Sequence, residues 1–205
     1  MLKNITHSLC KVEVLAFLVA FLAAGILWGY LENFLFWYLE DLGATKFLMG
    51  ISLAIGTLAG LPLTIFSTLI IKSLGHRKIV LLALILYAIR LFGYAQLTQV
   101  EVFLVLEVAK PFCTTLLLIS VMTFVKDNTP LTTMASMEAI FGSCYFGLGR
   151  GLGGLLGGFA IESLGRVMTF RLFGSFSLLI SALYAFVIAI QKCRKSRKYV
   201  FPINV

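Results

Sequence analysis

The stretch FLMGISLAIGTLAGLPLTIFSTLII, residues 47–71, contains no charged residue. A helix needs about 20 consecutive, mainly apolar residues to cross the hydrocarbon core of a bilayer. Residues 14–31 and 172–191 form two further apolar stretches that carry no charge. These three stretches predict transmembrane helices.

The composition of the whole chain agrees with this prediction. Sixty per cent of the 205 residues are apolar and 13% are charged, whereas about 25% of the residues of a soluble domain are charged. A chain with so few polar groups cannot cover its surface with them, so most of that surface must face lipid. The composition therefore excludes an ordinary soluble domain.

Three more stretches reach spanning length only if they include ionisable residues, namely Arg90, Glu107 with Lys110, and Arg150. We therefore predict an all-α fold, a polytopic transmembrane helical bundle that forms a single membrane domain over residues 1–205. Residues 192–205 are expected to form a basic cytoplasmic tail. The six predicted spans are at about residues 13–38, 47–71, 79–98, 102–125, 135–161 and 169–191.

The distribution of Lys and Arg predicts the orientation of the chain. These residues favour the cytoplasmic side of short loops. If the N-terminus is cytoplasmic, eleven of the 17 Lys and Arg residues lie inside, three lie in outer loops and three lie within spans. We therefore expect a multi-pass integral membrane protein with both termini in the cytoplasm, in the plasma membrane or an internal membrane. This bias also explains the net charge of +8 without nucleic acid as a partner.

Two short stretches resemble each other. KSLGHR, residues 72–77, follows the second predicted span, and ESLGR, residues 162–166, follows the fifth. Because three spans separate them, the two stretches should lie on opposite sides of the membrane. This arrangement predicts an inverted repeat of three spans plus three, a common plan among secondary transporters.

The glycine-rich stretch GLGRGLGGLLGG, residues 147–158, contains the pattern G-x-G-x-x-G. A dinucleotide site needs a preceding strand and a turn exposed to water, but this stretch lies inside the fifth predicted span. Helices in lipid associate through close contact between small residues. We therefore expect helix packing through six glycines: Gly25, Gly29, Gly147, Gly151, Gly154 and Gly158.

Ionisable side chains within the spans are costly, so each needs a partner or a function. An arginine at the centre of a span costs about 2.5–3.5 kcal/mol on insertion scales. Arg150 either pairs to hold helices together, or binds an anionic group or takes part in an ion relay. Arg90 is expected to be structural or to extend toward the membrane interface.

The acidic residues leave similar alternatives open. Glu32, which Asn33 follows, is either hydrated near the outer surface or faces a cavity as a carboxylate that couples transport to protons. Glu107 and Lys110 are three residues apart on one helix and can pair. Alternatively, Pro111 disrupts the helix and the pair forms a charged wall of a cavity. The candidate residues for substrate binding or ion coupling are therefore Glu32, Asn33, Glu107, Lys110 and Arg150.

Two stretches, NFLFWYLEDLGATKFLMG (33–50) and YFGLGRGLGGLLGGFAIESLGRVMTFRLFG (145–174), resemble the second half of a major facilitator superfamily transporter. The resemblance is to the branch that contains major facilitator superfamily domain-containing protein 6 and its relatives. It implies that the six spans correspond to spans seven to twelve of a twelve-span protein. The first, second, fourth and fifth spans would then line or gate a cavity, and the third and sixth would lie outside.

The resemblance also implies residue roles and a missing part. The glycine-arginine motif of the family would correspond to Gly147, Gly149, Arg150, Gly151, Gly153 and Gly154. The loop after the second span departs from the family pattern, because Lys72 and Ser73 stand where Asp and Arg are expected. The first six spans are absent, so the chain is expected to be a fragment, a truncated product, or a half that pairs with a complementary half or a second copy.

The function predicted from these observations is half of a secondary transporter that moves a small solute by alternating access, with proton coupling as one option. The alternative is a six-span accessory or receptor-like membrane protein that transports nothing. No group of side chains has the spacing of a metal site, and no nucleophile, base and orienting group form a recognisable set. We therefore expect no cofactor, no metal and no enzymatic activity, and as partners the lipid bilayer and a small-molecule substrate.

Overall fold

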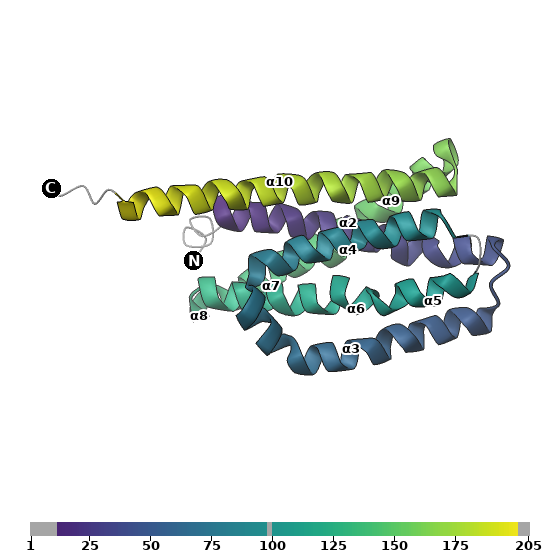
Figure 1. Cartoon of the computed structure of the whole chain (residues 1–205), viewed down its shortest axis with the longest axis horizontal. Coiled ribbons are helices and arrows are strands. Elements are labelled where there is room, and N and C mark those ends of the chain that lie inside the picture. The colour runs from purple at the N-terminus through teal and green to yellow at the C-terminus, as the bar shows by residue number, and fades with distance from the viewer. Residues whose placement is uncertain (1–11, 98–99, 201–205) are drawn as a thin grey trace.

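The computed structural model describes residues 12–97 and 100–200, and this part of the chain contains helices and no strands, which confirms the all-α prediction. Figure 1 shows the helices running roughly parallel to one long axis. In chain order they are α2 (Val12–Asp41), α3 (Lys46–Leu74), α4 (His76–Ala95), α5 (Val100–Val108), α6 (Lys110–Cys113), α7 (Thr115–Asn128), α8 (Leu131–Gly142), the π-helical turn η1 (Ser143–Gly149), α9 (Arg150–Leu164) and α10 (Arg166–Val200).

Five helical segments in the described part of the chain are long and apolar enough to cross a membrane: Val14–Asp41, Lys46–Leu74, His76–Ala95, Val102–Asn128 and Arg166–Gln191. They match five of the six predicted spans. The remaining one, predicted at residues 135–161, is helical throughout, but η1 divides it into α8 and α9. The count of six is therefore not reproduced by length and composition. The glycines and Arg150 lower the hydropathy of this segment, and a π-helical turn divides its α-helix.

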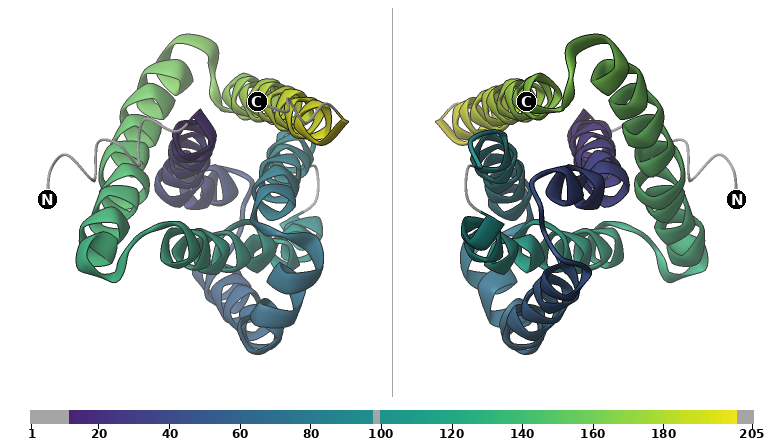
Figure 2. Two further views of the ribbon diagram at one scale, coloured as in Figure 1. Left: turned by 90° about the vertical axis from the view of Figure 1, so that its left-hand side faces the viewer. Right: turned by 90° about the vertical axis from the view of Figure 1, so that its right-hand side faces the viewer.

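The helices are arranged as a row with a second layer behind it. In Figure 2, α8–α9 and α3 lie at opposite ends of the row, and α2 and α5–α7 lie between them. Behind the row, α4 and α10 pack against each other along much of their length. The hydroxyl of Ser177 on α10 donates a hydrogen bond to the Leu84 carbonyl of α4 at 2.7 Å.

Aromatic rings form much of the core between the helices. Phe17 of α2 stacks on Phe124 of α7 with ring centroids 4.1 Å apart, and Tyr30 of α2 stacks on Phe173 of α10 at 4.2 Å. All four side chains are buried. These contacts place α2 at the centre of the bundle, because rings from both layers pack against it.

The two similar stretches of sequence have the same backbone geometry. Gly75 ends α3 with φ 78° and ψ 151°, and Gly165 ends α9 with φ 80° and ψ 165°. The N–H groups of Gly75 and Gly165 donate to the carbonyls of Ile71 and Ile161, at 2.8 and 2.9 Å. The two junctions lie at opposite ends of the bundle (Figure 1), as an inverted repeat requires.

The residue after each of these glycines contacts another helix in a similar way. At one end, His76 Nδ1 lies 3.0 Å from the Ser120 carbonyl oxygen, and Nε2 lies 3.4 Å from a carboxylate oxygen of Asp127. At the other end, Arg166 donates to the Trp37 carbonyl at 3.3 Å and forms an ion pair with Asp41. In each case the start of one helix is fixed against the last turns of another.

The junction geometry predicts equal effects of substitution at the two glycines. A side chain at a backbone conformation near φ 80° and ψ 151–165° costs about 1–3 kcal/mol, so Gly75→Ala and Gly165→Ala should each destabilise the protein by that amount. Gly50 is a suitable control, because it is helical and a Cβ there meets no atom within 4 Å. Thermal unfolding in detergent micelles measures all three variants, and a junction variant as stable as Gly50→Ala would contradict the prediction.

Candidate functional site

A groove with a volume of about 580 Å³ lies between α2 and the segment formed by η1 and α9. Its walls combine aromatic rings, one amide, one guanidinium group and several glycines. The lining residues are Asn33, Phe34, Trp37, Phe146, Gly147, Arg150, Gly151 and Gly154. We call this the α2–α9 groove. Its volume lies within the range of about 300–1,000 Å³ that is typical of small-molecule sites.

The polar groups of the α2–α9 groove are Arg150 and Asn33. The Arg150 side chain is exposed, and its guanidinium carbon lies 5.4 Å from the centre of the Trp28 ring, within the range of a cation–π contact. Arg150 forms no ion pair with the residues that the structure describes. Asn33 donates its amide to the Gly29 carbonyl at 2.7 Å, which leaves its amide oxygen as an acceptor.

Close contact between glycines holds the two walls of the groove together. A Cβ added at Gly29 would lie 2.5 Å from the Arg150 Cα, and one at Gly149 would lie 2.8 Å from the Gly25 Cα. A Cβ at Gly153 would collide with the Ile26 carbonyl oxygen. The backbones of α2 and α9 therefore touch directly, which is the packing that small residues permit in membranes.

The six glycines that we expected to pack helices together have different surroundings in the structure. Gly25 and Gly29 lie in the contact, but a Cβ at Gly147 or Gly151 would meet no atom within 4 Å. These two glycines line the groove instead. Gly154 and Gly158 face the side chains of Asn33 and Phe34. The line of closest approach on this segment passes through Gly149, Gly153 and Gly157, because these residues form the side that α2 meets.

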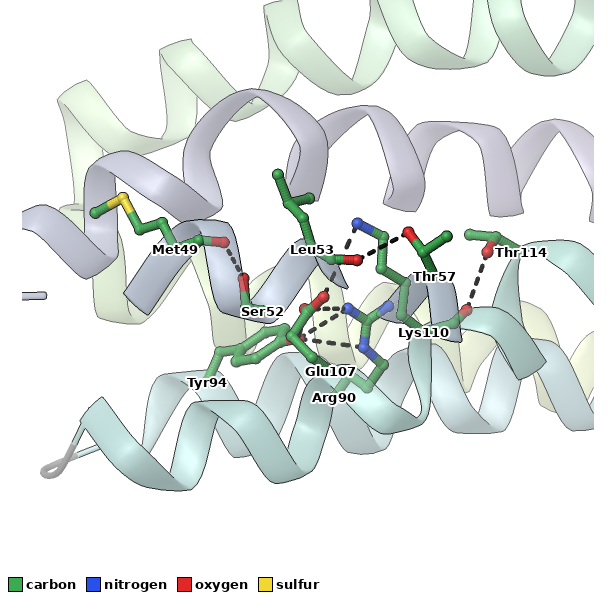
Figure 3. A network of polar contacts seen from close by, with 9 residues as sticks. All are labelled: Met49, Ser52, Leu53, Thr57, Arg90, Tyr94, Glu107, Lys110 and Thr114. Carbon is green, nitrogen blue, oxygen red and sulfur yellow. Dashed lines mark hydrogen bonds and ion pairs between the residues drawn. The ribbon is translucent and has the colours of Figure 1, made fainter. Parts of the chain in front are cut away.

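A second polar cluster lies where α4 meets α5, and Figure 3 shows its arrangement. Glu107 is 1% exposed and Arg90 is 2% exposed. One carboxylate oxygen of Glu107 accepts from Arg90 at 2.8 Å and from the Tyr94 hydroxyl at 2.7 Å. Arg90 also donates to that hydroxyl oxygen at 2.8 Å. The second carboxylate oxygen lies 3.9 Å from Lys110 Nζ.

The structure decides between the two alternatives for Arg90, a structural role and an extension toward the membrane interface. Arg90 is buried in an ion pair, so it is structural and does not extend to the interface. The Glu107–Lys110 contact exists but is longer than the contact that Glu107 makes with Arg90. Sequence reasoning did not select Tyr94, although it follows Arg90 by four residues, the spacing that places two side chains on one helix face.

A smaller groove of about 320 Å³ lies between α3 and the segment formed by α6 and α7. Lys110 lines it together with threonine side chains and two glycines of α3. The full lining is Leu53, Gly56, Thr57, Gly60, Leu61, Thr64, Lys110, Pro111, Thr114 and Thr115. We call this the α3–α6 groove. The α2–α9 and α3–α6 grooves are lined by the four predicted cavity segments and not by the outer helices α4 and α10.

Residues 3–172 match the family model described as the MFS_1 like family. The chain belongs to this family. Major facilitator superfamily domain-containing protein 6-like protein B of Xenopus laevis is 24% identical over 179 residues, which cover 82% of this chain and 29% of that protein. Major facilitator superfamily domain-containing protein 6-like of Homo sapiens is 27% identical over 137 residues, which cover 67% of this chain and 23% of that protein.

Membership of the MFS_1 like family confirms the predicted resemblance and assigns the chain to a superfamily of membrane transporters. Together with the five apolar helices, it identifies an integral multi-pass membrane protein. The chain spans less than a third of the length of the relatives that it matches. Members of such families are typically transporters and not enzymes, and the described residues contain no group of His, Cys, Asp and Glu that could hold a metal ion.

The structure places the five candidate residues in different positions. Arg150 and Asn33 lie together in the α2–α9 groove. Glu32 is exposed on α2 beside Asn33 but is not among the residues that line this groove. Glu107 is buried in the cluster with Arg90, and Lys110 extends from that cluster into the α3–α6 groove.

Proposed function

We propose that this MFS_1 like chain forms one half of a secondary active transporter, which moves a small solute with an anionic group by alternating access. The complementary half would cover the face that carries the two grooves, and each terminus would lie in the cytoplasm. Arg150 and Asn33 would contact the solute. The single observation that carries the proposal is the exposed Arg150 guanidinium, which lies in a groove of 580 Å³ without a carboxylate partner in the described chain.

The chemistry of the α2–α9 groove supports an anionic solute. A guanidinium group offers a planar set of N–H donors that matches a carboxylate or a phosphate. The rings of Phe34, Trp37 and Phe146 offer apolar surface beside it. The exposed carboxylate of Glu32 on the same helix as Asn33 is the candidate for proton coupling, because protonation would remove its charge.

A matched pair of probes tests the binding step. Benzoate and benzamide have similar shapes, and only benzoate carries a charge. We expect benzoate, and not benzamide, to raise the unfolding temperature of the chain in lipid nanodiscs, because a ligand that binds the native state stabilises it. Arg150→Gln should weaken benzoate binding about 10- to 150-fold, the equivalent of losing about 1.5–3 kcal/mol of charged hydrogen bonding.

Arg171 provides the control for that substitution, because it is exposed on α10 and lines neither groove. Arg171→Gln should bind benzoate as the unaltered chain does. Equal binding to the Arg150→Gln variant would contradict the proposed solute site. Uptake of benzoate into proteoliposomes, with the chain alone and with a first-half partner, then separates a transporter from the accessory or receptor-like alternative, which would bind but not transport.

A further inference from the structure

The α3–α6 groove lies beside an interruption in a membrane-spanning helix. α5 ends at Val108, α6 covers only Lys110–Cys113, and α7 begins at Thr115. Pro111 has no N–H group, so the carbonyl of Glu107 lacks its usual helical donor. Irregular backbone at membrane depth is tolerated where it is buried in protein or lines a cavity. The interruption here borders the α3–α6 groove.

Two glycines of α3 leave the space for this groove. A Cβ added at Gly56 would lie 3.5 Å from the Lys110 Cδ and 3.7 Å from a carboxylate oxygen of Glu107. A Cβ added at Gly60 would lie 3.4 Å from the Pro111 Cβ. These distances are ordinary contacts, so larger side chains at Gly56 and Gly60 would extend into the groove and reduce its volume.

The charges beside the groove do not cancel. Glu107 is one carboxylate between two cations, Arg90 at 2.8 Å and Lys110 at 3.9 Å. The side chains of Arg90 and Glu107 are 3% and 2% exposed, whereas that of Lys110 is 28% exposed. The excess positive charge of this cluster therefore reaches the groove through Lys110 (Figure 3).

Three of the four threonines that line the groove use their hydroxyl hydrogen within their own helical segment. The hydroxyl groups of Thr57, Thr64 and Thr114 donate to carbonyls of their own helices or helical segment, at 2.8, 3.0 and 3.0 Å. A hydroxyl group has one hydrogen to donate and two lone pairs. Each of these oxygens therefore keeps lone pairs for a donor on a ligand.

From these observations we propose that the α3–α6 groove is a binding site for a small hydroxylated anion, in which Lys110 contacts the carboxylate or phosphate and the threonines accept hydrogen bonds from the hydroxyl groups. Glu107 and Arg90 position Lys110 and do not touch the ligand. The volume of 320 Å³ is near the lower end for small-molecule sites, which selects a compact ligand. This site does not depend on the solute site proposed at Arg150.

Labelling of a cysteine in the groove tests the electrostatic part of the proposal. Thr57→Cys is introduced into a chain without its native cysteines, in nanodiscs of zwitterionic lipid, which supplies no anionic headgroup. An anionic and a cationic methanethiosulfonate of similar size are then compared. We expect the anionic reagent to react several-fold faster than the cationic one. The ratio of the anionic to the cationic reaction rate should fall in Lys110→Gln and persist in Lys110→Arg.

Protection of the same cysteine tests ligand binding. The probes are glycerate, which has a carboxylate and hydroxyl groups, propionate, which has only the carboxylate, and glycerol, which has only hydroxyl groups. Glycerate should slow the labelling most. Gly56→Val, which fills the groove without changing its charge, should remove this protection and slow both reagents.

Cysteine at Ser73 is the matched control, because Ser73 is exposed near the end of the same helix and is separated from position 57 by about 24 Å of helix. Its reagent ratio should not depend on Lys110. The proposal is overturned if Lys110→Gln leaves the ratio at position 57 unchanged in folded protein, or if glycerate protects no better than glycerol. The reagent ratio and the protection by glycerate both depend on the α3–α6 groove. They are therefore expected whether or not Arg150→Gln loses benzoate binding.

Discussion

Glu107→Ala is expected to destabilise the protein by about 3–5 kcal/mol, because it leaves the Arg90 guanidinium buried without a counter-charge. The same substitution removes the acceptor of the Tyr94 hydroxyl hydrogen bond at 2.7 Å. Arg90 is 2% exposed, and a water molecule in the space left by the carboxylate would restore a hydrogen bond but not the counter-charge. Thermal unfolding in detergent micelles, followed by tryptophan fluorescence, measures the effect.

A double substitution distinguishes the loss of the ion pair from a general packing defect. Replacing both members of a buried pair by apolar residues is often neutral or stabilising. Arg90→Met with Glu107→Met should therefore recover part of the stability that Glu107→Ala loses, less the cost of the buried Tyr94 hydroxyl, which loses both partners. A Glu107→Ala protein as stable as the unaltered chain would contradict the buried geometry. A double variant as unstable as the single one would show that the defect lies in packing or in the unpaired Tyr94 hydroxyl, and not in the unpaired charge.

Gly153→Ala is expected to have the second largest effect. It should lower the free energy of unfolding by about 3 kcal/mol or more, which is the upper end of the cost of overpacking. The added Cβ would collide with the Ile26 carbonyl oxygen and would lie 2.8 Å from the Tyr30 backbone nitrogen. Both are backbone atoms, so no side chain can turn aside, and α2 and α9 must separate. The yield of folded, monodisperse protein and its unfolding temperature measure the loss.

Gly151→Ala is the matched control, because the two glycines lie in the same helix and a Cβ at Gly151 meets no atom within 4 Å. Alanine is favoured over glycine within a helix by about 0.8–1 kcal/mol, so this variant should be at least as stable as the unaltered chain. Equal stability of Gly151→Ala and Gly153→Ala would contradict the direct contact between the two backbones.

The positions of the membrane-spanning helices could be predicted because lipid imposes a composition on them. Residues 47–71, which contain no charge, lie within α3, and the two glycines of the repeated stretches end α3 and α9. Both signals are local. An apolar run long enough to cross the bilayer has few alternatives to a helix, and a glycine is the residue that tolerates a positive φ of this kind.

Contacts between helices could be predicted only in part. Arg90 and Glu107 are 17 residues apart on different helices, and no sequence period links them. Lys110 was the partner that local spacing favoured, yet tertiary packing brings Arg90 closer to Glu107. The joint placement of Asn33 and Arg150 in one groove likewise depends on how α2 crosses α9. The sequence identified these residues as candidates but could not assign their neighbours.

The π-helical turn at Ser143–Gly149 changes the angular phase of the chain. An α-helix advances by about 100° per residue, and a wider turn advances less, so positions before and after η1 cannot be drawn on one helical wheel. The azimuth of Arg150 relative to α8 therefore depends on the number of residues in this turn as well as on their identity. A one-residue deletion within η1 would rotate α9, and with it the Arg150 guanidinium, relative to α8, and it would also disturb the close approach of η1 to Gly25 of α2.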